Sequence, residues 1–217
     1  MRGVTRALVV PVWRTLPWPA LAAAAALGLL AASVPALTGA EPAPWQTLVL
    51  LRGVALIGGL GLAFLLDDPA RHLTTPVPVR RPLRQALRVA LVAPFAALWW
   101  TAVLQVAPAA SRPPAGDLTL EAAAVGVLAL AGAATAIRLT DEARPGPAVV
   151  AVLLTAAVAA PLLTPEGWAL FVPAEDPRWP RAHDRWAVLL AALAAAWADH
   201  RFQDGEEGVL VDLQLRP

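Results

Sequence analysis

The chain has 217 residues, of which 58% are hydrophobic and 15% are charged, and its formal net charge is +1. A soluble domain carries about 25% charged residues, so this composition excludes an ordinary soluble domain, and the small net charge gives no global field that would attract nucleic acid. The sequence contains no cysteine, which excludes disulfides, thiolate metal sites and cysteine nucleophiles.

The N-terminal segment 4–15 (VTRALVVPVWRT) is apolar but too short to cross a bilayer. Arg6 and Arg14 flank its valines. Two interpretations stay open, namely a segment that lies in the cytoplasmic interface and a disordered basic start. The apolar run that begins at Ala20 is longer than the apolar region of a signal peptide, which has about 7–15 residues. We therefore expect that this segment is retained as the first helix of the mature protein.

Six apolar stretches predict membrane-spanning helices, because about 20 residues of helix cross a hydrocarbon core of about 30 Å. Backbone groups in lipid must also be paired within the segment, which favours helices. The predicted spans are 18–37, 45–66, 86–107, 118–137, 147–163 and 186–199. We therefore predict an all-α, polytopic membrane protein with a single transmembrane domain over residues 1–217.

The distribution of arginine predicts the orientation, because cytoplasmic loops carry an excess of basic residues. With the N-terminus inside, twelve arginines fall in inside segments and four in outside segments, and Arg52 lies within a span. We predict that both termini face the cytoplasm and that the protein resides in the bacterial cytoplasmic (inner) membrane.

The predicted cytoplasmic loop at 67–85 reads DDPARHLTTPVPVRRPLRQ. The two aspartates can cap a short helix that begins at Pro69, because their side-chain oxygens accept hydrogen bonds from its first amides. The arginines that follow set the topology and bind anionic lipids, or they form a docking surface for a cytoplasmic partner, and these two roles are compatible. The candidate docking residues are Asp67, Asp68, Arg71, His72, Arg80, Arg81 and Arg84.

Two ionisable residues fall within predicted spans, where charged groups are costly and mark candidate functional sites. Arg52 in the second span and Glu121 in the fourth lie at similar depth on the outer side, so they could form a pair. The pair either pins two helices together or lines a substrate path, to which Gln105 and Thr101 of the third span would also belong.

Two further features concern packing between the spans. Adjacent residues on a helix point about 100° apart, so we expect one of Trp99 and Trp100 to face lipid and the other a neighbouring helix. Small residues allow close helix approach, and the second span carries four of them, at Gly53, Gly58, Gly59 and Gly61.

No catalytic residue, metal site or cofactor is predicted. The three histidines fall on both sides of the membrane, and the sequence has no HExxH, GxSxG or GxxxxGK[ST] motif. The outer loop 164–184 is interpreted as an interfacial hairpin or as a plain surface loop. The cytoplasmic tail 200–217 alternates weakly at 209–215, so it would add a strand to a partner's sheet, or it is disordered or packs locally.

Taken together, these features resemble the membrane subunit of an ABC transporter, closest to the type-2, exporter-like permeases. The resemblance covers the whole chain as architecture: an interfacial segment before Trp18, six spans with both ends inside, the DDPARHL helix, and an outer loop with apolar patches between the last two spans. It implies that residues 67–75 are a coupling helix and that the subunit works as a homo- or hetero-oligomer. It also implies that a separate cytoplasmic ATPase subunit drives the transport of an amphiphilic or peptide-like substrate across the bilayer.

Other classes stay open beside this resemblance. The main alternative is a non-transporting anchor or assembly subunit of a larger membrane complex, whose informative surface would be a lipid-facing side or the tail. A small membrane enzyme acting on lipids would need more acidic partners around Asp67, Asp68 and His72, and a vitamin-uptake type of binding protein also has six spans.

Overall fold

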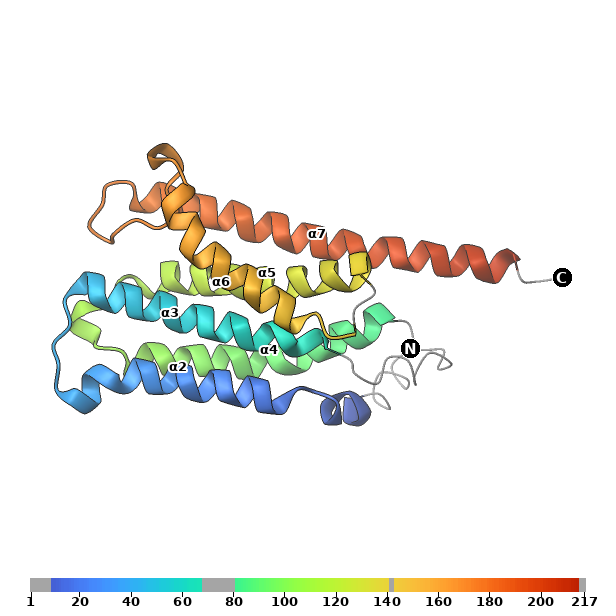
Figure 1. The fold of residues 1–217 in the computed structure, drawn as a ribbon, viewed down its shortest axis with the longest axis horizontal. Coiled ribbons are helices and arrows are strands. Elements are labelled where there is room, and N and C mark those ends of the chain that lie inside the picture. Colours follow the sequence, from blue (N-terminus) through green and yellow to red (C-terminus); the bar gives the residue numbers. More distant parts are fainter. Residues whose placement is uncertain (1–8, 68–80, 141–142, 215–217) are drawn as a thin grey trace.

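The computed structural model describes residues 9–67, 81–140 and 143–214, and within them the side chains of residues 81–82, 166 and 197–214 lie outside the description. Every regular element in these ranges is helical (Figure 1). The predicted all-α class is therefore confirmed for the described part of the chain.

Six long helices lie in the described ranges. They are α2 (Trp18–Thr38), α3 (Pro44–Ala63), α4 (Arg81–Val106), α5 (Ala115–Thr140), α6 (Gly146–Leu163) and α7 (Trp179–Gln214). A short helix at 9–14 precedes them, and three 3-10 turns lie between them at η1 (Phe64–Leu66), η2 (Ala109–Ser111) and η3 (Glu166–Trp168).

Among the residues that the structure describes, five helical segments are long and apolar enough to cross a bilayer. They are Trp18–Thr38, Pro44–Leu66, Leu83–Val106, Ala115–Thr140 and Gly146–Leu163, and they correspond to the first five predicted spans. The protein is thus a multi-pass helical membrane protein by length and composition. α7 contains the predicted sixth span but is not one of the five, so the sixth crossing and the orientation of the termini stay predictions.

The C-terminal region differs from the expectation. α7 begins at Trp179, inside the segment that we interpreted as outer loop, and continues through residues 200–214. The interpretation of 209–215 as strand-forming is therefore wrong up to Gln214. A run of leucine, valine, glutamine and aspartate does not oppose a helix strongly, and here the backbone continues the helix that precedes it.

Local signals explain several helix boundaries. α2 ends at Gly39, whose φ of +65° lies in the left-handed region that glycine adopts without steric cost. α3 starts with Pro44 in its first turn, and the Gln46 side chain accepts a hydrogen bond of 2.9 Å from the Ala43 amide.

The helices α3 and α5 pack against each other at the centre of the bundle. α2 packs on α3, and α4 packs mainly on α2, whereas α7 packs on α5 and α6 contacts both central helices. The start of α2 and the end of α7 lie at the same end of the bundle (Figure 1). We call this end, where α3 terminates, the Asp67 end, and the opposite one the Trp179 end.

Three of the four glycines of α3 make the close contacts expected of them. A Cβ atom would lie 2.8 Å from the Trp99 ring at Gly58, 2.7 Å from Val125 at Gly59 and 2.6 Å from Ala24 at Gly61. The expectation is wrong at Gly53, where a Cβ would meet open space.

Candidate functional site

A buried ion pair joins the two central helices near the Trp179 end. Arg52 of α3 donates from Nε to Oε2 of Glu121 and from Nη2 to Oε1, both at 2.7 Å. Glu121 of α5 is only 3% exposed. The two parallel hydrogen bonds form a bidentate guanidinium–carboxylate pair, which is stronger and more directional than a single contact. The sequence predicted that Arg52 and Glu121 could pair, and their role in a pathway stays a prediction.

α7 adds a histidine to this pair. The His183 ring is 6% exposed, its Nδ1 lies 2.9 Å from the Trp179 carbonyl oxygen, and its Nε2 lies 3.0 Å from Oε1 of Glu121. Among the described residues Nε2 makes no regular hydrogen bond. The contact with Glu121 is therefore a close polar approach whose direction deviates from hydrogen-bond geometry. We call Arg52, Glu121 and His183 the ionic cluster.

Aromatic and acidic groups surround the ionic cluster. The Trp179 indole N–H donates to Oδ2 of Asp117 at 2.6 Å, and the centroids of the Trp179 and His183 rings lie 4.2 Å apart. The Arg52 guanidinium stands 5.6 Å from the Phe171 ring centroid and 5.8 Å from that of Trp179, within cation–π range. The cluster thus links α3, α5 and the start of α7.

The segment before α7 is held against this cluster through its backbone. Arg52 Nη1 donates to the Val172 carbonyl at 3.3 Å, and the Trp186 indole donates to the Leu170 carbonyl at 3.2 Å. Arg185 donates to the carbonyls of Ala169 and Gly167 at 3.1 and 2.7 Å. Val172 is 2% exposed, whereas Gly167 and Trp168 are exposed, so the segment lies at the surface and is anchored to the core at Val172.

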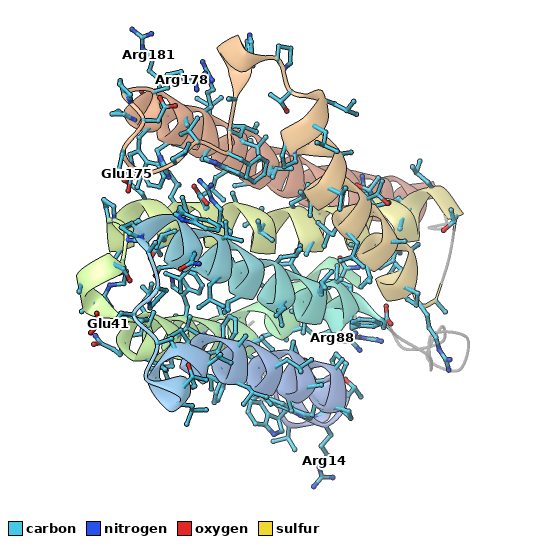
Figure 2. All side chains as sticks on the ribbon, turned by 60° about the vertical axis from the view of Figure 1, so that its left-hand side comes forward. Arg14, Glu41, Arg88, Glu175, Arg178 and Arg181 are labelled. Atoms are coloured by element: carbon cyan, nitrogen blue, oxygen red, sulfur yellow. The ribbon has the colours of Figure 1, made fainter. Side chains whose placement is uncertain are left out.

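A partly exposed acidic residue, Asp176, lies three residues before the start of α7. Asp176 accepts hydrogen bonds from the side chain and the backbone amide of Arg178. The side-chain hydrogen bond, followed by the backbone one, lowers the pKa of Asp176 from 3.8 to about 2. Figure 2 shows Arg178 and Arg181 at this end of the molecule, with Arg14 and Arg88 at the other.

Two residues predicted for the pathway lie elsewhere. Thr101 and Gln105 are on an exposed face of α4, and the Thr101 hydroxyl donates to the Ala97 carbonyl of its own helix at 2.8 Å. The structure does not bring them to the ionic cluster. Sequence reasoning missed His183, Trp179 and Asp117, although Trp179–His183 and Asp117–Glu121 are each four residues apart, the spacing of one helical face.

A second polar site ties three elements together at the Asp67 end. Oδ1 of Asp67 accepts the Gly146 amide N–H, which is at the N-terminus of α6, at 2.9 Å. Arg88 of α4 is 3% exposed and donates from Nη1 to the carbonyls of Asp67 at 2.8 Å and Leu65 at 3.3 Å. We call this arrangement the Asp67 junction, because it connects the end of α3 with α4 and α6.

Most of the predicted docking residues fall outside the Asp67 junction. Arg84 lies half-buried on α4, and Arg81 begins that helix with its side chain outside the described residues. Asp68, Arg71, His72 and Arg80 also lie outside the described residues, so their docking role stays a prediction.

An apolar cavity of about 570 Å³ lies between α2, α3, α4 and α5. Its walls include alanines and glycines of all four helices together with Trp99 and Trp100. The Trp99 indole donates to the Ala25 carbonyl of α2 at 2.9 Å, and the Trp100 indole donates to the Thr119 hydroxyl of α5 at 3.0 Å. Both tryptophans therefore reach neighbouring helices, and the expectation that one of them faces only lipid is wrong.

The rim of the cavity is open between α4 and α5. Ala93 and Ala97 on α4 and Ala123 on α5 line the cavity and are exposed. These residues face the surroundings of the helices, which for a membrane protein are hydrocarbon chains at this depth. The cavity is thus accessible to apolar molecules from the side.

No family model matches the chain, and neither a curated protein nor a solved structure matches it. Within the described residues no group of three or more histidines and carboxylates is arranged to hold a metal ion.

Proposed function

We propose that this chain is the membrane permease subunit of an ATP-driven transporter, that it moves an amphiphilic substrate, and that ATP hydrolysis takes place on a separate chain. The observation that carries this proposal is the Asp67 junction. The predicted coupling segment 67–75 begins at Asp67. A force that a partner applies to this segment would therefore be transmitted through the junction to α3, α4 and α6.

The Asp67 junction supports coupling because its contacts are short and partly buried. The Asp67 carboxylate sits at the positive end of the α6 helix dipole, and the Arg88 guanidinium bridges two carbonyls at the end of α3. A Cβ atom at Gly146 would lie 2.5 Å from the Phe64 ring and 3.0 Å from Oδ2 of Asp67, so the approach of α6 depends on glycine. Displacement of Asp67 would therefore move α3, α4 and α6 together.

The apolar cavity supports the choice of an amphiphilic substrate. Its volume of about 570 Å³ falls within the range of about 300–1,000 Å³ that is typical of ligand pockets. Its hydrogen-bonding side-chain groups, the indoles of Trp18, Trp99 and Trp100 and the Thr119 hydroxyl, already have partners. Hydrocarbon is therefore favoured over water as its content, and a polar head would remain outside.

The proposed orientation has six crossings and both termini in the cytoplasm of a bacterial cell, with α7 as the sixth crossing. It is supported by the common end of α2 and α7 (Figure 1) and by the arginines of the Asp67 end, since basic residues accumulate on the cytoplasmic side. Those described are Arg14, Arg84, Arg88, Arg138 and Arg144.

The test is a pull-down of the tagged chain from its native membrane in mild detergent, followed by identification of the bound proteins. We expect an ATP-hydrolysing subunit, and we expect its loss when Arg81 and Arg84 are both replaced by glutamate. The matched control replaces Arg178 and Arg181 by glutamate, which makes the same change in charge at the opposite end of the molecule.

Two outcomes would contradict the proposal. Normal recovery of the ATPase with the Arg81→Glu, Arg84→Glu variant would remove the docking role of the loop. Recovery of other membrane subunits without any ATPase would instead favour the anchor or assembly function.

The substrate class has a separate test. A photoreactive long-chain amphiphile should label residues of the cavity wall in the intact protein, and Ala123→Phe, which narrows the opening between α4 and α5, should reduce the labelling. Ala151→Phe, at an exposed position of α6 away from the cavity, is the control. Equal labelling of all three proteins would count against the cavity as a binding site.

A further inference from the structure

The apolar cavity is closed at both of its ends along the helices. Toward the Trp179 end its walls finish at Ala55 and Trp100, which belong to the core cluster around Leu51. Toward the Asp67 end they finish at Leu65 and Leu130, which pack together in a second core cluster. A molecule that reaches the cavity through the opening between α4 and α5 therefore comes from the hydrocarbon of the membrane.

The cavity is about as long as one leaflet of a bilayer is thick. Its wall residues lie within 55–65 on α3, 89–100 on α4 and 119–130 on α5. At about 1.5 Å per residue these stretches rise by about 15–17 Å. A hydrocarbon core of about 30 Å has two leaflets, each of about 15 Å. The cavity can therefore hold a hydrocarbon chain that extends through one leaflet.

The cavity lies in the half of the membrane next to the Asp67 end. The apolar segment of α3 is Pro44–Leu66, and the wall residues within 55–65 belong to the half of it that leads to Asp67. α2 begins at the same end (Figure 1), and its wall residues lie at its start, within 18–25. A chain in the cavity therefore belongs to a lipid of the leaflet at this end.

The walls suit a hydrocarbon chain but not its head group. None of the described residues that line the cavity is charged, and its alanines and glycines leave space in which a chain makes dispersion contacts. Arg88, at the edge of the wall on α4, donates to backbone carbonyls at the end of α3. The head group therefore stays at the surface of the leaflet. At that end Arg14 is exposed and Arg84 is half-buried, and basic residues favour an anionic head group.

We propose that the cavity binds the hydrocarbon chain of a membrane lipid from the leaflet at the Asp67 end, while the head group of this lipid stays at the surface of that leaflet. The inference deepens the proposed function and rests on it for one point, namely that the lipid is the transported substrate. In the proposed orientation the Asp67 end is cytoplasmic, so the substrate is collected from the cytoplasmic leaflet. Binding of the chain itself depends on the cavity alone.

The direction in which the chain lies can be measured with two photoreactive phospholipids in nanodiscs. One probe carries a diazirine near the head group and the other carries it at the end of the chain, and mass spectrometry locates the labelled residues. We expect the first probe to label the Asp67 side of the cavity, at Leu62 and Val89. The second probe should label the Trp179 side, at Trp99 and Ala122, because a chain runs inward from its head group.

A matched pair of variants on α4 separates the cavity from the outer surface of the helix. Ala96→Phe places a ring in the cavity, whereas Ala102→Phe places it at an exposed position outside the cavity. Labelling of the wall residues should fall severalfold in Ala96→Phe and stay unchanged in Ala102→Phe. Thermal unfolding in detergent verifies that both variants fold, and Ala123→Leu at the rim on α5 replaces Ala96→Phe if that variant does not.

Three outcomes would overturn the inference. The reverse order of labelling would assign the chain to the opposite leaflet. Labelling of neither side would mean that lipid does not enter, as expected where a second copy of the chain covers the opening. Equal labelling in Ala96→Phe would place the probes on the outer surface. These measurements need no ATPase, so they can fail while the pull-down still recovers an ATPase, and the reverse.

Discussion

The two faces of α5 are held to their neighbours in different ways. On one face Glu121 lies 3.0 Å from His183 Nε2 and Asp117 accepts the Trp179 indole N–H at 2.6 Å, so two carboxylates contact the start of α7. On the other face Thr119 receives a single indole N–H from α4, and the rest of the space between α4 and α5 is the apolar cavity.

The difference follows from the solvent of a membrane protein. Apolar surfaces gain little when they leave lipid for another helix, so polar contacts and close packing decide where helices associate. α7 is less apolar than the five candidate spans and needs polar partners, whereas α4 is apolar and can stand apart wherever hydrocarbon fills the gap. A tight interface and an open one can therefore share one helix.

The largest effect should come from the charged face. Glu121→Ala leaves the Arg52 guanidinium partly buried without its carboxylate, and the loss of one partner from a buried pair costs about 3–5 kcal/mol of unfolding free energy. Arg52→Ala should also destabilise the protein, and exchange of the two charges should restore part of the loss. Thermal unfolding in detergent measures these changes, and Glu175→Ala at an exposed position is the control. If neither single variant lowers the unfolding temperature, the pair does not hold α3 to α5.

Crowding the other face should cost less. Gly58→Ala adds a Cβ that would lie 2.8 Å from the Trp99 ring of α4. Overpacking of this kind lowers the free energy of unfolding by about 1–3 kcal/mol, which thermal unfolding in detergent measures. Gly53→Ala on the same helix meets open space and should be neutral or stabilising. If both variants unfold at the same temperature, Trp99 moves freely into the cavity and α4 is less firmly placed than its contacts indicate.

Removing one hydrogen bond from the open face should have a smaller effect. Trp100→Phe loses the bond to the Thr119 hydroxyl and should lower stability by about 0.5–1.5 kcal/mol. Trp45→Phe makes the same substitution at an exposed position in the first turn of α3 and is the matched control. A loss as large as that of Glu121→Ala would erase the contrast between the two faces.

The smallest effect concerns the exposed start of α7. Because the folded-state pKa of Asp176 is lowered to about 2 from 3.8, its stabilising contribution is present above about pH 4 and is lost as the pH falls towards 2. The protection factors of the amides in the first turn of α7, which correct for the intrinsic pH dependence of hydrogen exchange, should therefore fall over this interval and, at higher pH, in Asp176→Asn. Faster exchange across the whole of α7 would mean that Asp176 belongs to the buried interface.

The sequence was sufficient for much of the helical architecture. Apolar runs closed by Thr38-Gly39 and by Asp67 correspond to the ends of α2 and α3, and an arginine and a glutamate at similar depth do pair. The start of α7 was misplaced because Trp179, His183 and Arg185 are polar enough to resemble a loop when the partners on α5 are not known. A helix start that depends on tertiary contacts cannot be read from the hydrophobic periodicity of that helix alone.

The cavity was equally hidden from the sequence. The glycines of α3 predict close approach, and they make it at Gly58, Gly59 and Gly61. At other positions the same residue types line empty space, because α4 packs on α2 and reaches the central helices mainly through its tryptophans. Composition alone does not separate these two uses of alanine and glycine.

The unbroken length of α7 gives the ionic cluster mechanical reach. Its 36 residues extend for about 54 Å at about 1.5 Å per residue, whereas a hydrocarbon core is about 30 Å thick, so α7 is about 24 Å longer than a membrane crossing requires. Figure 1 shows this extension past the rest of the bundle. A tilt of about 10° at the His183 end would swing the far end by about 9 Å, so a small change among the contacts that hold the start of α7 becomes a large displacement at its other end.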